Sequence, residues 1–140
     1  MDFNKKELLF KYEFSDAWHM TIFELVILNK KENNIFMSTD LTSKSIELPC
    51  LLEEDIEKIK EIVCNEKIYE INQDEVEMPM VMDGYNNTFT FNNGEQLKEI
   101  DVCNMRYLEI KDTKNAKIIK ECFDKISKIV YKRTYVKMPL

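Results

Sequence analysis

The amino-acid sequence predicts an α+β fold, with a mainly antiparallel sheet and two amphipathic helices packed on one of its faces. Strand-like segments occur in two runs, and each run is followed by a helical pattern. The only two glycines, Gly84 and Gly94, each follow Asp or Asn, as is typical of tight hairpin turns. Because helices do not alternate regularly with strands, a parallel βαβ fold is disfavoured. At 140 residues, the chain is expected to form a single α+β domain, 1–140.

The first run of strands begins with alternating apolar residues near the N-terminus. Four of them are expected on one side of a strand: Leu8, Phe10, Tyr12 and Phe14. The next segment, 18–28, is apolar on both faces and predicts a central strand, either covered on both sides or bulged near Phe23. Two shorter strands, at 35–37 and 45–48, would complete an antiparallel meander.

A first helix is expected at about 52–65. Its apolar stripe recurs every three or four residues, at Leu52, Ile56, Ile59 and Val63. Acidic residues fill its first turn, where the helix dipole favours negative charge. On the side opposite the stripe, Glu53, Glu57 and Glu61 form an acidic face.

The second run of strands surrounds the two glycines. After a short strand at 67–71, the segment 85–91 alternates Phe89 and Phe91 with threonines. In the return arm, Leu97 is out of phase with Ile100 and Val102, which predicts a bulge or register change near position 99.

The longest predicted element is a second amphipathic helix at about 114–133. Ile118, Cys122, Ile126 and Val130 form its apolar stripe. Its last turns are basic, which suits the helix dipole. A strip of lysines beside the apolar stripe is expected to lie over the edge of the core and face the first helix, which has the opposite charge: Lys114, Lys117, Lys125, Lys128 and Lys132. Residues 134–138 could add a closing edge strand.

The composition excludes several classes of function. The net charge of -6 disfavours nucleic acid and anionic membranes as partners. No apolar run approaches the roughly 20 residues needed to span a bilayer, and the N-terminus lacks the apolar core of a signal peptide, so a cytoplasmic location is expected. The 4 cysteines are unevenly spaced, as expected for reduced thiols. Neither a metal motif nor a phosphate-binding loop is present, so no cofactor is predicted.

The strongest candidate for catalysis is Cys50, which lies just ahead of the first helix. A cysteine near a helix N-terminus can become a nucleophile, and His19 is the only imidazole that could serve as its base. The acidic residues that follow Cys50 oppose thiolate formation, and no signature of a known cysteine enzyme surrounds it. A structural role for both residues is therefore favoured over a catalytic one.

Two surfaces are candidates for protein binding. One is the acidic face formed by Glu53, Glu57 and Glu61, which would suit a basic partner. The other is a flexible strand edge that bears Met78, Met80 and Met82, where Pro79 cannot donate to a ladder. A small-ligand pocket between the sheet and the helices is a third possibility, although no convergent polar set supports it.

The second half of the chain resembles a group of small bacterial domains. The resemblance depends on Asp83-Gly84, a strand at 88–91, Asn93-Gly94, a second strand and a late helix through Phe123. It implies an α+β fold and no particular activity. In general character, a small acidic domain without a catalytic constellation is similar to immunity proteins that neutralise basic toxins. The sequence therefore favours a non-enzymatic interaction domain, with a small enzyme or a ligand-binding domain as alternatives.

Overall fold

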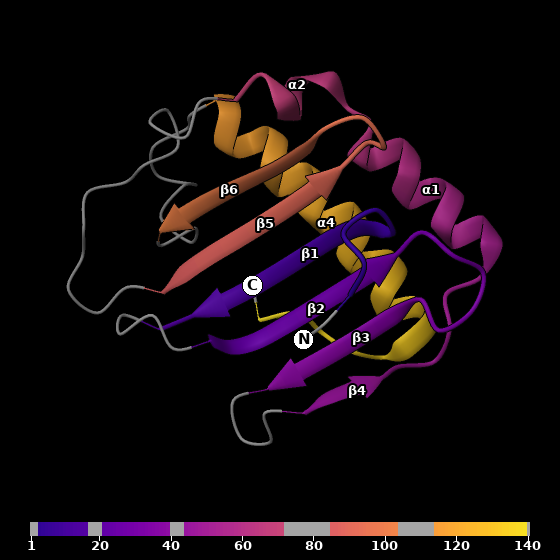
Figure 1. Ribbon diagram of the computed structural model, residues 1–140. Coiled ribbons are helices and arrows are strands. Elements are labelled where there is room, and N and C mark those ends of the chain that lie inside the picture. Colours follow the sequence, from indigo (N-terminus) through magenta and orange to yellow (C-terminus); the bar gives the residue numbers. More distant parts are fainter. Residues whose placement is uncertain (1–2, 17–20, 40–43, 72–84, 104–113, 140) are drawn as a thin grey trace.

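The structure is a computed structural model that describes residues 3–16, 21–39, 44–71, 85–103 and 114–139. The described residues form a six-stranded antiparallel sheet in the order β4-β3-β2-β1-β5-β6 (Figure 1). The strands are β1 (Leu8–Ser15), β2 (Thr21–Leu28), β3 (Ile35–Thr39), β4 (Ser45–Glu47), β5 (Asn86–Asn92) and β6 (Leu97–Cys103). The helices are α1 (Glu53–Val63), α2 (Glu66–Tyr69) and α4 (Lys114–Thr134). The predicted α+β class is confirmed.

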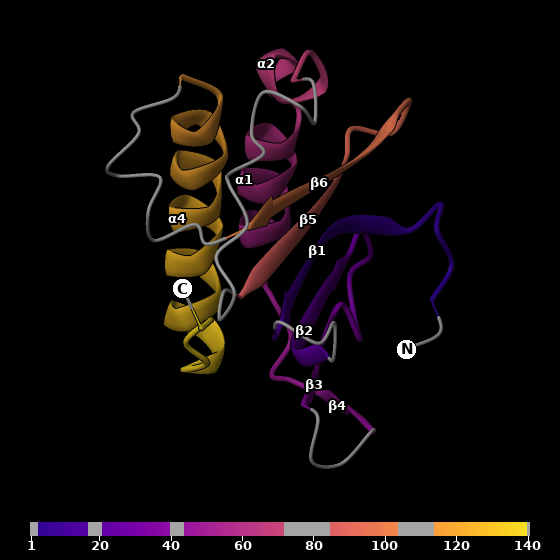
Figure 2. The same cartoon turned by 90° about the vertical axis from the view of Figure 1, so that its left-hand side faces the viewer.

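The two long helices, α1 and α4, lie side by side on one face of the sheet (Figure 2). Between them and the sheet is the main apolar core, in which the ring centroid of Tyr12 lies 4.9 Å from that of Phe123 in α4. Ile56 and Ile59 of α1 are buried in the same core. Both helices agree with the predicted ranges to within two residues. None of the helices in the described ranges is long and apolar enough to cross a membrane.

A β-bulge at Leu9 divides the apolar residues of β1 between the two faces of the sheet. Leu8 pairs with Leu28 and Phe10 pairs with Ile27, so β1 has an extra residue between these pairs. The bulge places Leu9 and Phe10 together in the main core, whereas Leu8 joins a smaller apolar cluster on the opposite face. The prediction that Leu8 shares a side with the other apolar residues of its strand is wrong, because alternation does not continue through a bulge.

β2 lies in the interior of the sheet and is bulged near Phe23, as predicted. Phe14 of β1 pairs with Phe23, whereas the next residue, Ser15, pairs with Thr21. At the other end of β2, consecutive side chains are buried on opposite faces, which explains the apolar composition of this strand on both sides.

Residues 67–71 do not form the predicted short strand, because the short helix α2 occupies most of this segment. The Asn65 side chain caps α2 by accepting a hydrogen bond from the backbone N–H of Lys67 at 3.1 Å. The Tyr69 hydroxyl donates to the carbonyl oxygen of Val63 at 2.7 Å and ties α2 to the end of α1. Capping, and not apolar alternation, decides the structure here.

The last described residues also differ from the prediction, because 134–138 do not form a closing strand. Tyr135 has a positive φ of 59°, and its N–H donates to the carbonyl oxygen of Tyr131 at 2.9 Å. This hydrogen bond ends α4 and directs the chain back towards the main core, where Met138 is buried.

The return arm of the second hairpin contains no bulge. The pairing of β5 with β6 runs without interruption, so the predicted register change near position 99 is wrong. Leu97 is out of phase with Ile100 and Val102 because it lies at the start of β6 on the other face, where it is 44% exposed.

The turn between β5 and β6 is built on Asn93 and Gly94. The Asn93 side-chain oxygen accepts hydrogen bonds from the N–H groups of Glu95 at 2.9 Å and Gln96 at 2.7 Å. Gly94 has a φ of 94°, a conformation that residues with a Cβ atom rarely adopt. The first predicted turn, at Gly84, lies outside the described residues.

We expect Gly94→Val to lower the free energy of unfolding by about 1–2 kcal/mol, because a β-branched residue is strained at positive φ. Nothing lies within 4 Å of the position where the new Cβ would stand, so the loss would come from the backbone alone. Urea titration of the wild-type protein and of the Gly94→Val variant measures this loss of unfolding free energy. Glu95→Val is the matched control, because Glu95 is exposed in the same turn. Equal unfolding midpoints for both variants would refute the role of Gly94.

Candidate functional site

The outer side of α1 carries the predicted acidic residues Glu53, Glu57 and Glu61. All three are exposed, whereas Ile56 and Ile59 on the opposite side are buried in the main core. A spacing of four residues places the three carboxylates on successive turns of one helical face. We call Glu53, Glu57 and Glu61 the acidic face.

One basic side chain modifies the acidic face. The ammonium of Lys60 lies 3.1 Å from a carboxylate oxygen of Glu57, yet the Glu57 side chain remains 60% exposed. Leu52, which the sequence places in the apolar stripe on the other side, is 47% exposed, so the buried part of the stripe begins at Ile56. The acidic face therefore remains exposed and mainly negative.

Two other acidic residues of α1 bind Arg133 of α4. Its Nε donates to Oδ2 of Asp55 at 2.6 Å, and its Nη2 donates to Oε1 of Glu54 at 2.7 Å. The Asp55 carboxylate is almost completely buried and also accepts the backbone N–H of Leu52 at 2.9 Å, which caps α1. The hydrogen bond that Arg133 donates to Asp55 raises the pKa of Arg133. These interactions fix the position of α1 relative to α4.

The sequence predicted an electrostatic contact between the two helices but assigned it to a strip of lysines on the second helix. The structure assigns it to Arg133, which the sequence reasoning did not single out. Arg133 is the only arginine predicted in that helix, and only an arginine can donate to two carboxylates through separate nitrogens of a planar group. The presence of a single arginine in this helix could therefore have identified Arg133 as the contact residue.

Cys50 lies on an exposed segment that connects β4 to α1. Its Sγ is 3.3 Å from the carbonyl oxygen of Lys31 and 3.2 Å from that of Leu51, so these two oxygens share its single S–H donor. The segment is held by the buried side chain of Asn34, whose Nδ2 donates to the Leu51 carbonyl at 3.0 Å and whose Oδ1 accepts the Leu51 N–H at 2.9 Å. Cys50 is therefore part of a junction between the β2–β3 turn and α1.

The proposed base, His19, lies outside the described residues, as do the three methionines Met78, Met80 and Met82. The pairing of Cys50 with His19 and the methionine-bearing edge therefore remain predictions. Among the residues that the structure describes, no group of three His, Cys, Asp or Glu side chains is arranged to hold a metal ion.

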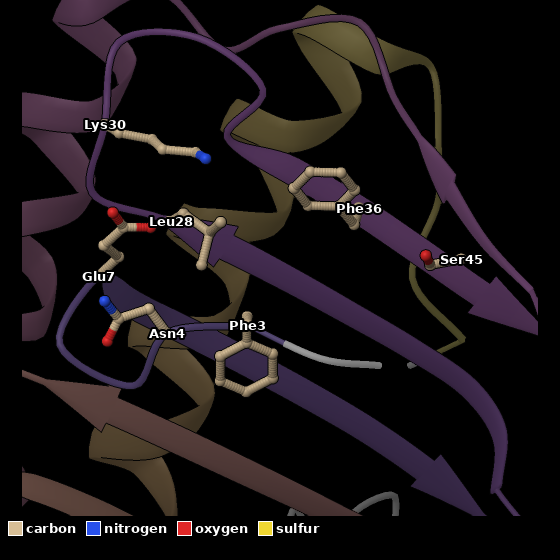
Figure 3. A pocket seen from close by; sticks show the side chains of 7 residues that line it. All are labelled: Phe3, Asn4, Glu7, Leu28, Lys30, Phe36 and Ser45. Carbon is tan, nitrogen blue, oxygen red and sulfur yellow. The ribbon is translucent and has the colours of Figure 1, made fainter.

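A hollow of about 250 Å³ lies on the face of the sheet that the helices leave open (Figure 3). Its lining comes from the N-terminal segment, the β2–β3 turn and strands β2, β3 and β4: Phe3, Asn4, Glu7, Leu28, Lys30, Phe36 and Ser45. The sequence suggested a pocket between the sheet and the helices, whereas this hollow lies on the opposite side of the sheet. We call it the open-face hollow.

Comparison of the chain with protein-family models, with curated proteins and with solved structures finds no match.

We expect Asp55→Ala to lower the free energy of unfolding by at least about 1 kcal/mol, the usual cost of a lost helix cap. The variant also leaves the Arg133 guanidinium without its buried partner. Glu54→Ala is the control, because it removes the exposed partner of the same arginine and should have a smaller effect. Urea unfolding curves provide the comparison, and an equal loss in both variants would contradict the structural role of Asp55.

We expect Cys50 to react with N-ethylmaleimide at a rate comparable to that of Cys64, which is also free and exposed. Each rate is measured at neutral pH in a variant that retains only that exposed cysteine. A Cys50 rate that is at least about tenfold higher, and that falls in His19→Ala, would instead support the cysteine-enzyme hypothesis.

Proposed function

We propose that this chain is a non-enzymatic protein-interaction domain that binds a basic partner through the acidic face of α1. The observation that carries the proposal is the row of exposed carboxylates on a helix whose other side is anchored in the core. In this respect the chain would act in the general manner of an immunity protein that neutralises a basic toxin.

The chemistry of the acidic face suits a basic partner. Exposed charges of one sign accelerate association with an oppositely charged surface and select against partners of the same charge. The net charge of -6 adds a favourable long-range field.

The support of α1 makes this surface rigid. Arg133 holds the N-terminal turn through Asp55, and Tyr69 binds the carbonyl oxygen of Val63 at the C-terminal end. A surface that is already ordered loses little conformational entropy when it binds. The acidic face is therefore ready to bind without rearrangement of the helix.

The experiment compares two variants with the same change in net charge. A stoichiometric partner is first recovered from native extract, and its association rate is then measured at several salt concentrations. The test variant reverses three charges on the acidic face: Glu53→Lys, Glu57→Lys and Glu61→Lys. The matched control reverses three exposed glutamates elsewhere: Glu32→Lys, Glu95→Lys and Glu99→Lys.

We expect the test variant to associate about tenfold more slowly or worse, and the control to retain most of its rate. The difference should shrink as salt increases, because exposed charges are screened. Circular dichroism establishes that both variants remain folded, and a milder triple Glu→Gln variant is available if the reversals unfold α1. Equal rates for test and control would refute the acidic face as the binding surface.

A further inference from the structure

The open-face hollow has an apolar floor. Leu28 is 4% exposed and belongs to an apolar cluster with Leu8 and Val26. The rings of Phe3 and Phe36 pack against this cluster and flank Leu28 (Figure 3). An apolar group of suitable size in contact with this floor would remove apolar surface from water, which is favourable.

Two opposite charges stand at one end of the hollow. Figure 3 shows the carboxylate of Glu7 on the side of Leu28 away from Ser45, and the ammonium of Lys30 on the side of Leu28 away from Phe3. Both side chains are half-buried, and in the described part of the chain neither charged group forms an ion pair. A partly buried charge without a partner is stabilised when a ligand supplies the opposite charge.

Hydrogen bonds to the backbone hold the two segments that carry these charges. The N–H of Asn29 donates to the carbonyl oxygen of Glu7 at 2.6 Å, which joins the two segments that carry the charges. The N–H of Lys30 donates to the Leu28 carbonyl at 3.0 Å, and the Asn34 side chain donates to the Lys30 carbonyl at 3.2 Å. The backbone at the charged end of the hollow is therefore ordered before any ligand arrives.

We propose that the open-face hollow binds a small zwitterion with an apolar side chain, of the chemical class of leucine and phenylalanine. Its carboxylate would bind Lys30, its ammonium would bind Glu7, and its side chain would lie on Leu28 and Phe36. The volume of about 250 Å³ exceeds the roughly 150 Å³ of an engineered apolar cavity that holds benzene, so an aromatic side chain with its charged groups has room. This site lies on the opposite side of the sheet from α1 and does not depend on the function proposed for the acidic face.

The test titrates three probes that separate the two charges of the ligand. L-phenylalanine carries both charges, 3-phenylpropionate carries only the carboxylate, and 2-phenylethylamine carries only the ammonium. Binding is followed by the amide NMR shifts of Asn29, Lys30 and Phe36. We expect L-phenylalanine to bind about tenfold more tightly than either single-charge probe, because each charge-assisted hydrogen bond contributes separately.

Two variants test which residue of the protein binds each charged group of the ligand. Lys30→Met should weaken L-phenylalanine and 3-phenylpropionate about tenfold and leave 2-phenylethylamine unchanged. Glu7→Gln should weaken L-phenylalanine and 2-phenylethylamine and leave 3-phenylpropionate unchanged. Lys31→Met is the matched control, because Lys31 is exposed beside Lys30 and does not line the hollow. Ser45→Phe, which narrows the hollow from its exposed edge, should weaken all three probes.

Several results would overturn the proposal. These are an absence of shifts at the solubility limit of L-phenylalanine, equal affinity for all three probes, and an effect of Lys31→Met as large as that of Lys30→Met. The amide spectrum of each variant shows whether it is folded. Because Lys30 and Glu7 make no side-chain hydrogen bonds in the described part of the chain, their substitution should leave the fold intact.

Discussion

The fold depends on the contact between one face of the sheet and α4, and Tyr12 lies at its centre. The Tyr12 ring lies 6.1 Å from Phe23 of β2, 5.3 Å from Phe89 of β5 and 4.9 Å from Phe123 of α4, measured between centroids. Its hydroxyl donates to Oδ1 of Asn87 at 2.6 Å, so its one buried polar group is satisfied. Burial raises the pKa of Tyr12, so the hydroxyl keeps the proton that it donates. One side chain thus joins three strands and the longest helix.

Because the helices cover only one face of the sheet, only individual side chains cover the other face. Near the middle of this open face, Lys11 forms ion pairs with Glu13 and Glu24, which keep that part of the face polar. Towards the β2–β3 turn the face is apolar, and the N-terminal segment contributes Phe3, whose ring lies 5.5 Å from the Lys11 ammonium. A single aromatic ring covers less area than a helix. The open-face hollow exists because this coverage is incomplete.

The sequence predicted those features that depend on a repeating pattern. The stripe of α1 and the alternation of Phe89 and Phe91 were sufficient to place a helix and a strand, because periodic apolar residues have only one way to be buried together. The features that it missed depend on single residues. These features are the bulge at Leu9, the cap at Asn65 and the hydrogen bonds of Arg133 to two carboxylates of α1. None of them changes the apolar pattern of the sequence around it. The open-face hollow was missed for a related reason, since its lining comes from segments that are distant in the sequence and meet only in the sheet.

The acidic face and the open-face hollow lie on opposite sides of the sheet, yet one buried amide connects the segments that carry them. Asn34 donates to the carbonyl oxygen of Lys30, which borders the hollow, and exchanges two hydrogen bonds with Leu51, two residues before α1 begins. The Cys50 thiol adds a second link between the same segments through the Lys31 carbonyl. The open-face hollow and the start of α1 are therefore supported by the same hydrogen-bonded backbone.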